Sequence, residues 1–160
     1  MNSELSEFQS VTVFVLTNNE TFLLRETIEK IKNCDCFNDI SRIIIVAKNE
    51  SCNGFFEAKR IIDEDTTDKV ELYLQKSSTI ELCIAELPHL VKDSHFIIMA
   101  ADMEMNPGEI PEFIRLAKKK PEAIICAAKW MKSSVVEGYG KIHEMGSRSM
   151  NVFVSLLFGK

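Results

Sequence analysis

The chain has 160 residues, 46% of them hydrophobic and 27% charged, a composition typical of one globular domain. Its net charge of −5 argues against a nucleic-acid-binding protein that would gain affinity by neutralising phosphates. The polar N-terminus is not a signal peptide, and no apolar run reaches the roughly 18–20 residues that a membrane-spanning helix needs.

Apolar runs with strand character alternate with segments of helical spacing along the chain. Glu26 and Lys30 are expected to pair on the outer face of the first helix, as are Arg25 and Glu29. This alternation predicts an α/β fold with a mostly parallel sheet covered by helices on both faces. We expect strands at 11–16, 43–46, 70–74, 96–101 and 123–128, and helices at 23–31, 55–63, 80–91 (bent or ended near Pro88) and 107–117 (capped by Asn106).

Two carboxylates follow the fourth expected strand. Asp102 and Glu104 are separated by one residue and come directly after an apolar run. Ligands of α/β proteins bind at the carboxyl ends of the strands, and Mg²⁺ and Mn²⁺ prefer hard oxygen ligands. The pattern therefore indicates a metal site built from Asp102 and Glu104. The alternative is that Asp102 caps a turn and that Glu104 is a solvated loop residue.

Polar residues also follow the first two expected strands. Thr17, Asn19 and Glu20 come after the first strand, and Lys48 comes after the second. These positions face the ligand in a doubly wound sheet, although simple capping of the next helix is an equal explanation for the first loop. Arg148 lies in a later glycine-containing segment, where it is either a phosphate-binding residue or a surface residue at the start of a helix.

The five cysteines show no paired C-x-x-C motifs of a zinc site. Cys34 and Cys36 form a single C-x-C in a polar linker. Reduced thiols without a special role are the simplest interpretation, with a redox or metal role as the alternative. No metal spacing relates the three histidines, and neither a glycine-rich phosphate loop nor a G-x-S-x-G motif is present.

Taken in order, the motifs resemble those of the family-2 glycosyltransferases, and most closely the branch that loads sugars onto polyprenyl phosphates. The opening turn L-T-N-N-E at 16–20 is similar to the family's P-x-Y-N-E-like turn. The run A-A-D-M-E-M-N-P at 100–107, followed by I-P at 110–111, is similar to its D-x-D region. The segment S-R-S-M-N at 147–151 leads into the apolar stretch L-L-F-G at 156–159, as in the polyprenyl branch.

The resemblance implies a nucleotide-sugar-binding fold of the GT-A type, Rossmann-like in architecture. It implies Mg²⁺ or Mn²⁺ on Asp102 and Glu104, and a lipid-phosphate or glycan acceptor in a cell-envelope pathway. It also implies a cytoplasmic enzyme at the inner face of a membrane, and a domain over residues 11–160 that is incomplete at its C-terminus after a flexible segment at 1–10. The donor-binding residues would be Thr17, Asn19, Glu20, Lys48, Asp102 and Arg148.

The chain departs from the family pattern in three places, which leave the nucleotide unassigned, and the missing acidic residues at Ala47 and Ala100 also support a different function. Ala100 replaces the first acidic residue of D-x-D, Ala47 and Lys48 replace an acidic pair after the second strand, and Leu16 and Asn18 replace the proline and tyrosine of the opening turn. The alternative is therefore a non-catalytic binding or scaffold domain that retains the fold. A sugar-nucleotide pyrophosphorylase would need a glycine-rich basic loop after the first strand, which residues 17–20 lack. The apolar stretch 152–158, where exposed, would favour self-association.

Overall fold

The computed structural model describes residues 7–127, 145, 149 and 150. The chain divides into two compact units, Met1–Ile125 and Cys126–Lys160. In the second unit, the described residues 145, 149 and 150 are helical. The first unit contains β1 (Val11–Thr17), α1 (Phe22–Lys32), β2 (Ile40–Ala47), α2 (Asn53–Asp63), β3 (Val70–Leu74), α3 (Ile80–Glu86), β4 (His95–Ala100) and α4 (Ile110–Lys119).

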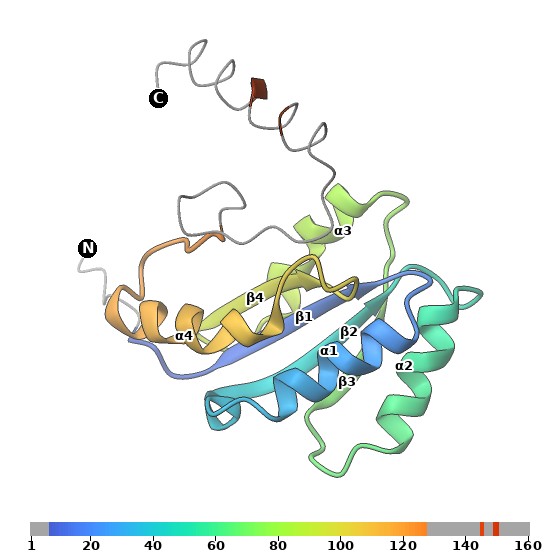
Figure 1. Ribbon diagram of the computed structural model, residues 1–160, viewed down its shortest axis with the longest axis horizontal. Helices are drawn as coiled ribbons and strands as arrows, with labels where there is room; N and C mark the ends of the chain where they lie inside the picture. Colours follow the sequence, from blue (N-terminus) through green and yellow to red (C-terminus); the bar gives the residue numbers. More distant parts are fainter. Residues whose placement is uncertain (1–6, 128–144, 146–148, 151–160) are drawn as a thin grey trace. The chain divides into compact units, whose positions relative to one another are not determined.

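The four strands form one parallel sheet in the order β3-β2-β1-β4 (Figure 1). Strand order reverses between β1 and β4, because the chain builds outwards from β1 to β3 and then returns to the other side of β1. β1 and β2 are central in this described sheet, and their β-branched and aromatic side chains are buried on both faces. The α/β fold with a mostly parallel sheet is thus confirmed.

Helices cover both faces of the sheet. On one face, Val13, Val15, Leu24 and Ile114 belong to a core shared by β1, α1, α2 and α4. On the other face, Phe14 packs with residues of α3 and of the short 3₁₀ turn Leu87–Leu90 that follows it. This turn contains Pro88, which is where the sequence predicted the helix to bend or end. No helix in the described part of the chain is long and apolar enough to cross a membrane.

Two local predictions are wrong. Residues 123–127 of the expected fifth strand have no regular secondary structure and Ile124 is 94% exposed, while residue 128 lies outside the described part. Arg25 pairs with Glu57 and Glu64 of the α2 region instead of Glu29, because α2 packs beside α1 and offers a less exposed carboxylate. The Glu26–Lys30 pair is confirmed, with a distance of 2.9 Å between Oε1 and Nζ.

A half-buried polar cluster joins the amino ends of β1, β2 and β4. The Asp93 carboxylate accepts hydrogen bonds from the hydroxyls of Ser10, Thr12 and Ser41. Burial alone would raise the pKa of Asp93, but these three hydrogen bonds and the positive charge of Arg42 hold it below its ordinary value. The cluster fastens the edge of the sheet opposite to the strand ends at which ligands bind in this class of fold.

Candidate functional site

The loops at the carboxyl edge of the sheet begin side by side. Lateral backbone hydrogen bonds continue one residue past the strands: Gln75 N donates to Ala47 O at 2.9 Å, and Lys48 N donates to Thr17 O at 3.3 Å. On the other side of β1, Ala101 N donates to Leu16 O at 2.9 Å. The loops that follow the four strands therefore all start at one edge of the sheet. The strand order reverses at this edge between β1 and β4. This is the position where open α/β sheets bind ligands.

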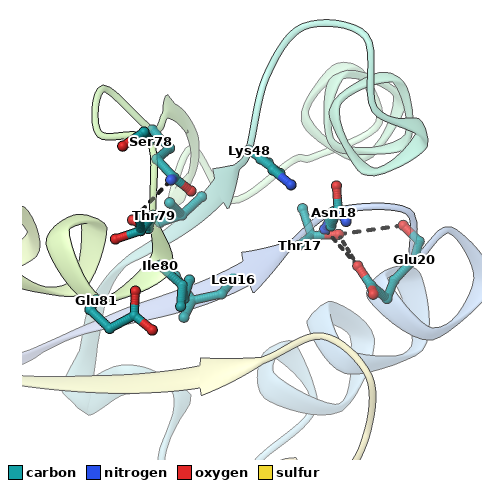
Figure 2. A pocket seen from close by; sticks show the side chains of 11 residues that line it. Leu16, Thr17, Asn18, Glu20, Lys48, Ser78, Thr79, Ile80 and Glu81 are labelled. Atoms are coloured by element: carbon teal, nitrogen blue, oxygen red, sulfur yellow. Dashed lines mark hydrogen bonds between the residues drawn. The ribbon is translucent and has the colours of Figure 1, made fainter.

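An open pocket of about 440 Å³ lies at this edge, between the loops after β1 and β2 and the segment leading into α3. Figure 2 shows the Lys48 side chain extending towards Thr17 and Asn18, with the segment from Ser78 to Glu81 on the opposite side. Leu16 and Val46 add apolar lining. This volume is in the range of small-molecule sites, which combine apolar walls with a few convergent polar groups. The polar lining residues are Thr17, Asn18, Glu20, Lys48, Gln75, Ser78, Thr79 and Glu81.

The loop after β1 is held in shape by Glu20. Its carboxylate accepts hydrogen bonds from Asn18 N at 2.6 Å and from Thr17 Oγ1 at 3.1 Å (Figure 2). Burial would raise the pKa of Glu20, but these bonds from Asn18 and Thr17 dominate and lower it. Glu20 is therefore an anionic positioning residue. The alternative interpretation, that this loop simply caps α1, is wrong, since the N-cap is Thr21, whose side chain makes no capping bond.

Gly54 allows the start of α2 to pack closely against the same loop. Its N–H donates to Asn18 O at 2.9 Å, and a Cβ at this position would lie 2.4 Å from Thr17 Oγ1. Only a residue without a side chain lets the helix approach this closely. The loop after β1 is thus supported by α2 from behind while its other side lines the pocket.

A tight turn carries Asp102 and Glu104 away from the end of β4. Asp102 Oδ1 accepts a hydrogen bond from Glu104 N at 3.0 Å, and both residues are exposed. Between them, Met103 has a positive φ of 63°, and its Sδ accepts a hydrogen bond from the Thr27 hydroxyl of α1 at 3.3 Å. The turn then runs into Asn106, whose Oδ1 accepts from Gly108 N at 3.0 Å and caps the 3₁₀ turn Pro107–Glu109 before α4, as its sequence predicted.

The sequence-predicted residues fall into three groups. Thr17, Glu20 and Lys48 line the pocket together, and Asn19 lies in the same loop without lining it. Asp102 and Glu104 lie on the other side of β1, after β4, and do not line the pocket. Arg148 lies outside the described residues.

Sequence reasoning missed the contribution of the segment after β3. Gln75 Nε2 donates to Ser77 O at 2.6 Å and to Thr79 O at 3.1 Å, which folds this segment over the pocket. The sequence does indicate this residue, because Gln75 directly follows an apolar strand in the same way as Lys48 follows β2.

The chemistry of Asp102 and Glu104 fits a hard divalent cation. Both offer exposed carboxylate oxygens, and Mg²⁺ commonly takes one or two protein carboxylates together with phosphate oxygens of its substrate. Within residues 7–127, 145, 149 and 150, no three His, Cys, Asp or Glu side chains gather into a metal-binding group. Among the described residues, therefore, Asp102 and Glu104 have no third side chain of these types beside them to complete a cation site.

No family model matches the chain, and no curated protein matches it.

Proposed function

We propose that this protein binds a nucleoside-diphosphate sugar at the carboxyl edge of its sheet and transfers the sugar to an acceptor, as the glycosyltransferases that it resembles do. One observation carries the proposal: the polar pocket beside β1 and the two-carboxylate turn after β4 flank the point where strand order reverses. The acceptor class implied by the resemblance is a polyprenyl phosphate or a glycan. A polyprenyl acceptor would place the reaction at the cytoplasmic face of a membrane.

The pocket supplies recognition groups for a nucleoside diphosphate. Lys48 brings a positive charge that attracts a diphosphate, while Thr17 and Asn18 bring a hydroxyl and an amide suited to ribose or base atoms. Glu20 keeps both of these residues in place through its hydrogen bonds to them. Binding in this arrangement depends on a loop that is already formed before the ligand arrives, which reduces the entropic cost of association.

Asp102 and Glu104 would hold Mg²⁺ or Mn²⁺ in this scheme. When bound, the cation neutralises the charge that grows on the diphosphate leaving group as the glycosidic bond breaks. The chain's own part is to present two carboxylates on a turn that is anchored to α1 through Met103 and Thr27.

Binding without transfer is the second candidate function. The observation that favours it is the replacement of expected acidic residues by Ala47 at the end of β2 and by Ala100 at the end of β4. A domain of this kind would retain the nucleotide pocket and lack the complete set of groups for transfer. Sugar release from the donor separates the two functions, because only the transferase releases a free nucleoside diphosphate.

The test is calorimetric titration of the full chain with UDP, GDP and their common sugar conjugates, with and without Mn²⁺. We expect cation-dependent binding that Asp102→Ala abolishes and that Asp63→Ala retains, since Asp63 is an exposed aspartate at the far end of α2. Lys48→Gln should weaken binding about tenfold or more, whereas Lys120→Gln, an exposed lysine beyond α4, should not. A folded protein that binds none of these nucleotides would contradict both candidate functions.

A further inference from the structure

Two cysteines meet in the turn that leads from α1 to β2. Cys34 Sγ and Cys36 Sγ lie 2.9 Å apart, with the exposed Asp35 between them in sequence. Backbone hydrogen bonds fix the turn on both sides: Cys34 N donates to Ile31 O at 3.3 Å, and Phe37 N donates to Cys34 O at 3.0 Å. The two sulfurs are therefore held together by the backbone, and roughly 0.9 Å of approach separates them from disulfide bonding distance.

The two thiols differ in their access to solvent. Cys36 is 9% exposed and belongs to the main core, whereas Cys34 is half-buried. Cys34 also lines a second open pocket of about 520 Å³ between α1 and the start of α4, where Gly108 and Pro111 form part of the wall. A small reagent can reach Cys34 through this pocket, whereas the buried Cys36 does not line it.

The environment of Cys36 suits a thiol that reacts after Cys34 has reacted, and not before it. Burial, together with the neighbouring Cys34 thiol, raises the pKa of Cys36 to about 12. A thiol with so high a pKa has a small thiolate fraction at neutral pH and reacts slowly with reagents in solution. It reacts more readily with the Cys34 sulfur, because the closeness of the two sulfurs offsets the low thiolate fraction of Cys36.

We propose that Cys34 and Cys36 form a reversible dithiol–disulfide site, with Cys34 as the residue that first reacts with a small disulfide and Cys36 as the residue that closes the ring. The Cys34 thiolate attacks one sulfur of the small disulfide RS–SR, forms a mixed disulfide and releases RS⁻. Cys36 then attacks the Cys34 sulfur and releases the second RS⁻. The two cysteine protons pass to the released thiolates, so that two cysteines are oxidised and one RS–SR is reduced to two RSH.

The experiment equilibrates the full chain with oxidised and reduced glutathione, alkylates remaining thiols and measures tryptic peptides by mass spectrometry. Cleavage after Lys32 and Arg42 yields the peptide 33–42, which contains both cysteines and none of the other three. We expect this peptide to lose two hydrogen atoms under oxidising conditions and to regain them with dithiothreitol. Full alkylation of both cysteines under conditions that oxidise Cys126, the exposed cysteine of the described residues, would overturn the proposal.

Two variants test the order of the steps. In Cys36→Ser the reaction should stop with one glutathione on Cys34, and in Cys34→Ser the thiol of Cys36 should stay unmodified over the same time. Cys83→Ser, which removes a different buried thiol, should behave as the unmodified chain does. Glutathione retained on Cys34 of the unmodified chain, or Cys36 modified at the same rate in Cys34→Ser, would overturn the assigned roles. The mass measurement on the unmodified chain stands on its own if a variant fails to fold.

Discussion

Gly54→Ala should force apart the start of α2 and the pocket loop after β1. The new Cβ would lie 2.4 Å from Thr17 Oγ1, 2.9 Å from Thr17 Cγ2 and 2.9 Å from Asn18 O. Contacts this short are not tolerated, and the Asn18 oxygen belongs to the backbone, so the strain is not relieved by turning a side chain alone. Either the helix or the loop has to move.

Overpacking at such a site typically costs about 1–3 kcal/mol. Alanine is a better helix former than glycine by up to about 1 kcal/mol in a helix interior, but Gly54 is the second residue of α2, where this gain is smaller. We therefore expect a net loss of about 1–2 kcal/mol in the free energy of unfolding. For a chain of this size, that corresponds to a fall of about 2–8 °C in Tm.

Thermal and urea unfolding followed by far-ultraviolet circular dichroism measure this loss. Gly108→Ala is the matched control, because the three nearest atoms to its new Cβ all belong to the exposed Asn106 side chain, the closest at 3.1 Å. A shift of a few tenths of an ångström in that side chain relieves this contact and leaves its capping hydrogen bond from Gly108 N in place. The Tm of this variant should change much less. If Gly54→Ala unfolds at or above the temperature of the unmodified chain, the loop yields without cost and the argument that α2 supports the pocket is refuted.

Two further predictions concern carboxylates that are held by ion pairs or hydrogen bonds. Glu57→Gln should lower the free energy of unfolding by about 2–3 kcal/mol in a urea titration, because the Glu57 side chain is 9% exposed and binds Arg25 with an Oε1–Nη2 distance of 2.7 Å. Lys30→Ala removes only an exposed pair and should cost less than about 0.5 kcal/mol, so equal losses in the two variants would contradict this reasoning. Asp93→Asn should destabilise the protein at neutral pH, with a smaller difference from the unmodified chain in acid. The pKa of Asp93 is lowered in the folded chain, so its stabilisation is complete above the ordinary value of 3.8 and disappears as pH falls through the lower folded value. Urea titrations between about pH 7 and pH 3 measure this difference, and one that stays constant across the range would disprove the role of the hydroxyl cluster.

Local sequence patterns sufficed for most of the sheet because β1 and β2 are buried on both faces, and such strands are continuous apolar runs. The same composition misled at residues 123–127. An apolar run becomes a strand only where a neighbouring edge accepts its hydrogen bonds, and that depends on contacts distant in sequence. His95 Nε2 instead donates to Pro121 O at 3.0 Å, which ties the segment after α4 to the start of β4 through a side chain.

Long-range pairing explains the remaining difference at α1. Arg25 satisfies the spacing rule for Glu29 but reaches Glu57 and Glu64, which lie 32 and 39 residues away in sequence. Helix periodicity shows which residues share a face, and it does not show which helix packs against that face. The pocket was partly predictable because it does not depend on which helices pack together. Parallel strands all place their carboxyl ends at one edge of the sheet, so any polar residue that follows a strand is a candidate for lining a ligand site. Applied to β3 as well, this rule would have found Gln75.

The backbone at Met103 shows how the turn after β4, to which we assign the proposed cation site, is held in shape. A methionine with a φ of 63° costs on the order of 1 kcal/mol or more, and a glycine would avoid this cost. The surrounding structure offsets it: the completely buried Thr27 donates its hydroxyl to Met103 Sδ, while Ala101 and Pro107 are buried on either side of the exposed carboxylates. A positive φ alone does not indicate a function, because Asp68 has a φ of 55° in the loop that joins α2 to β3. The contacts that hold Met103 in its conformation also fix the turn that carries Asp102 and Glu104, as the proposed cation site requires.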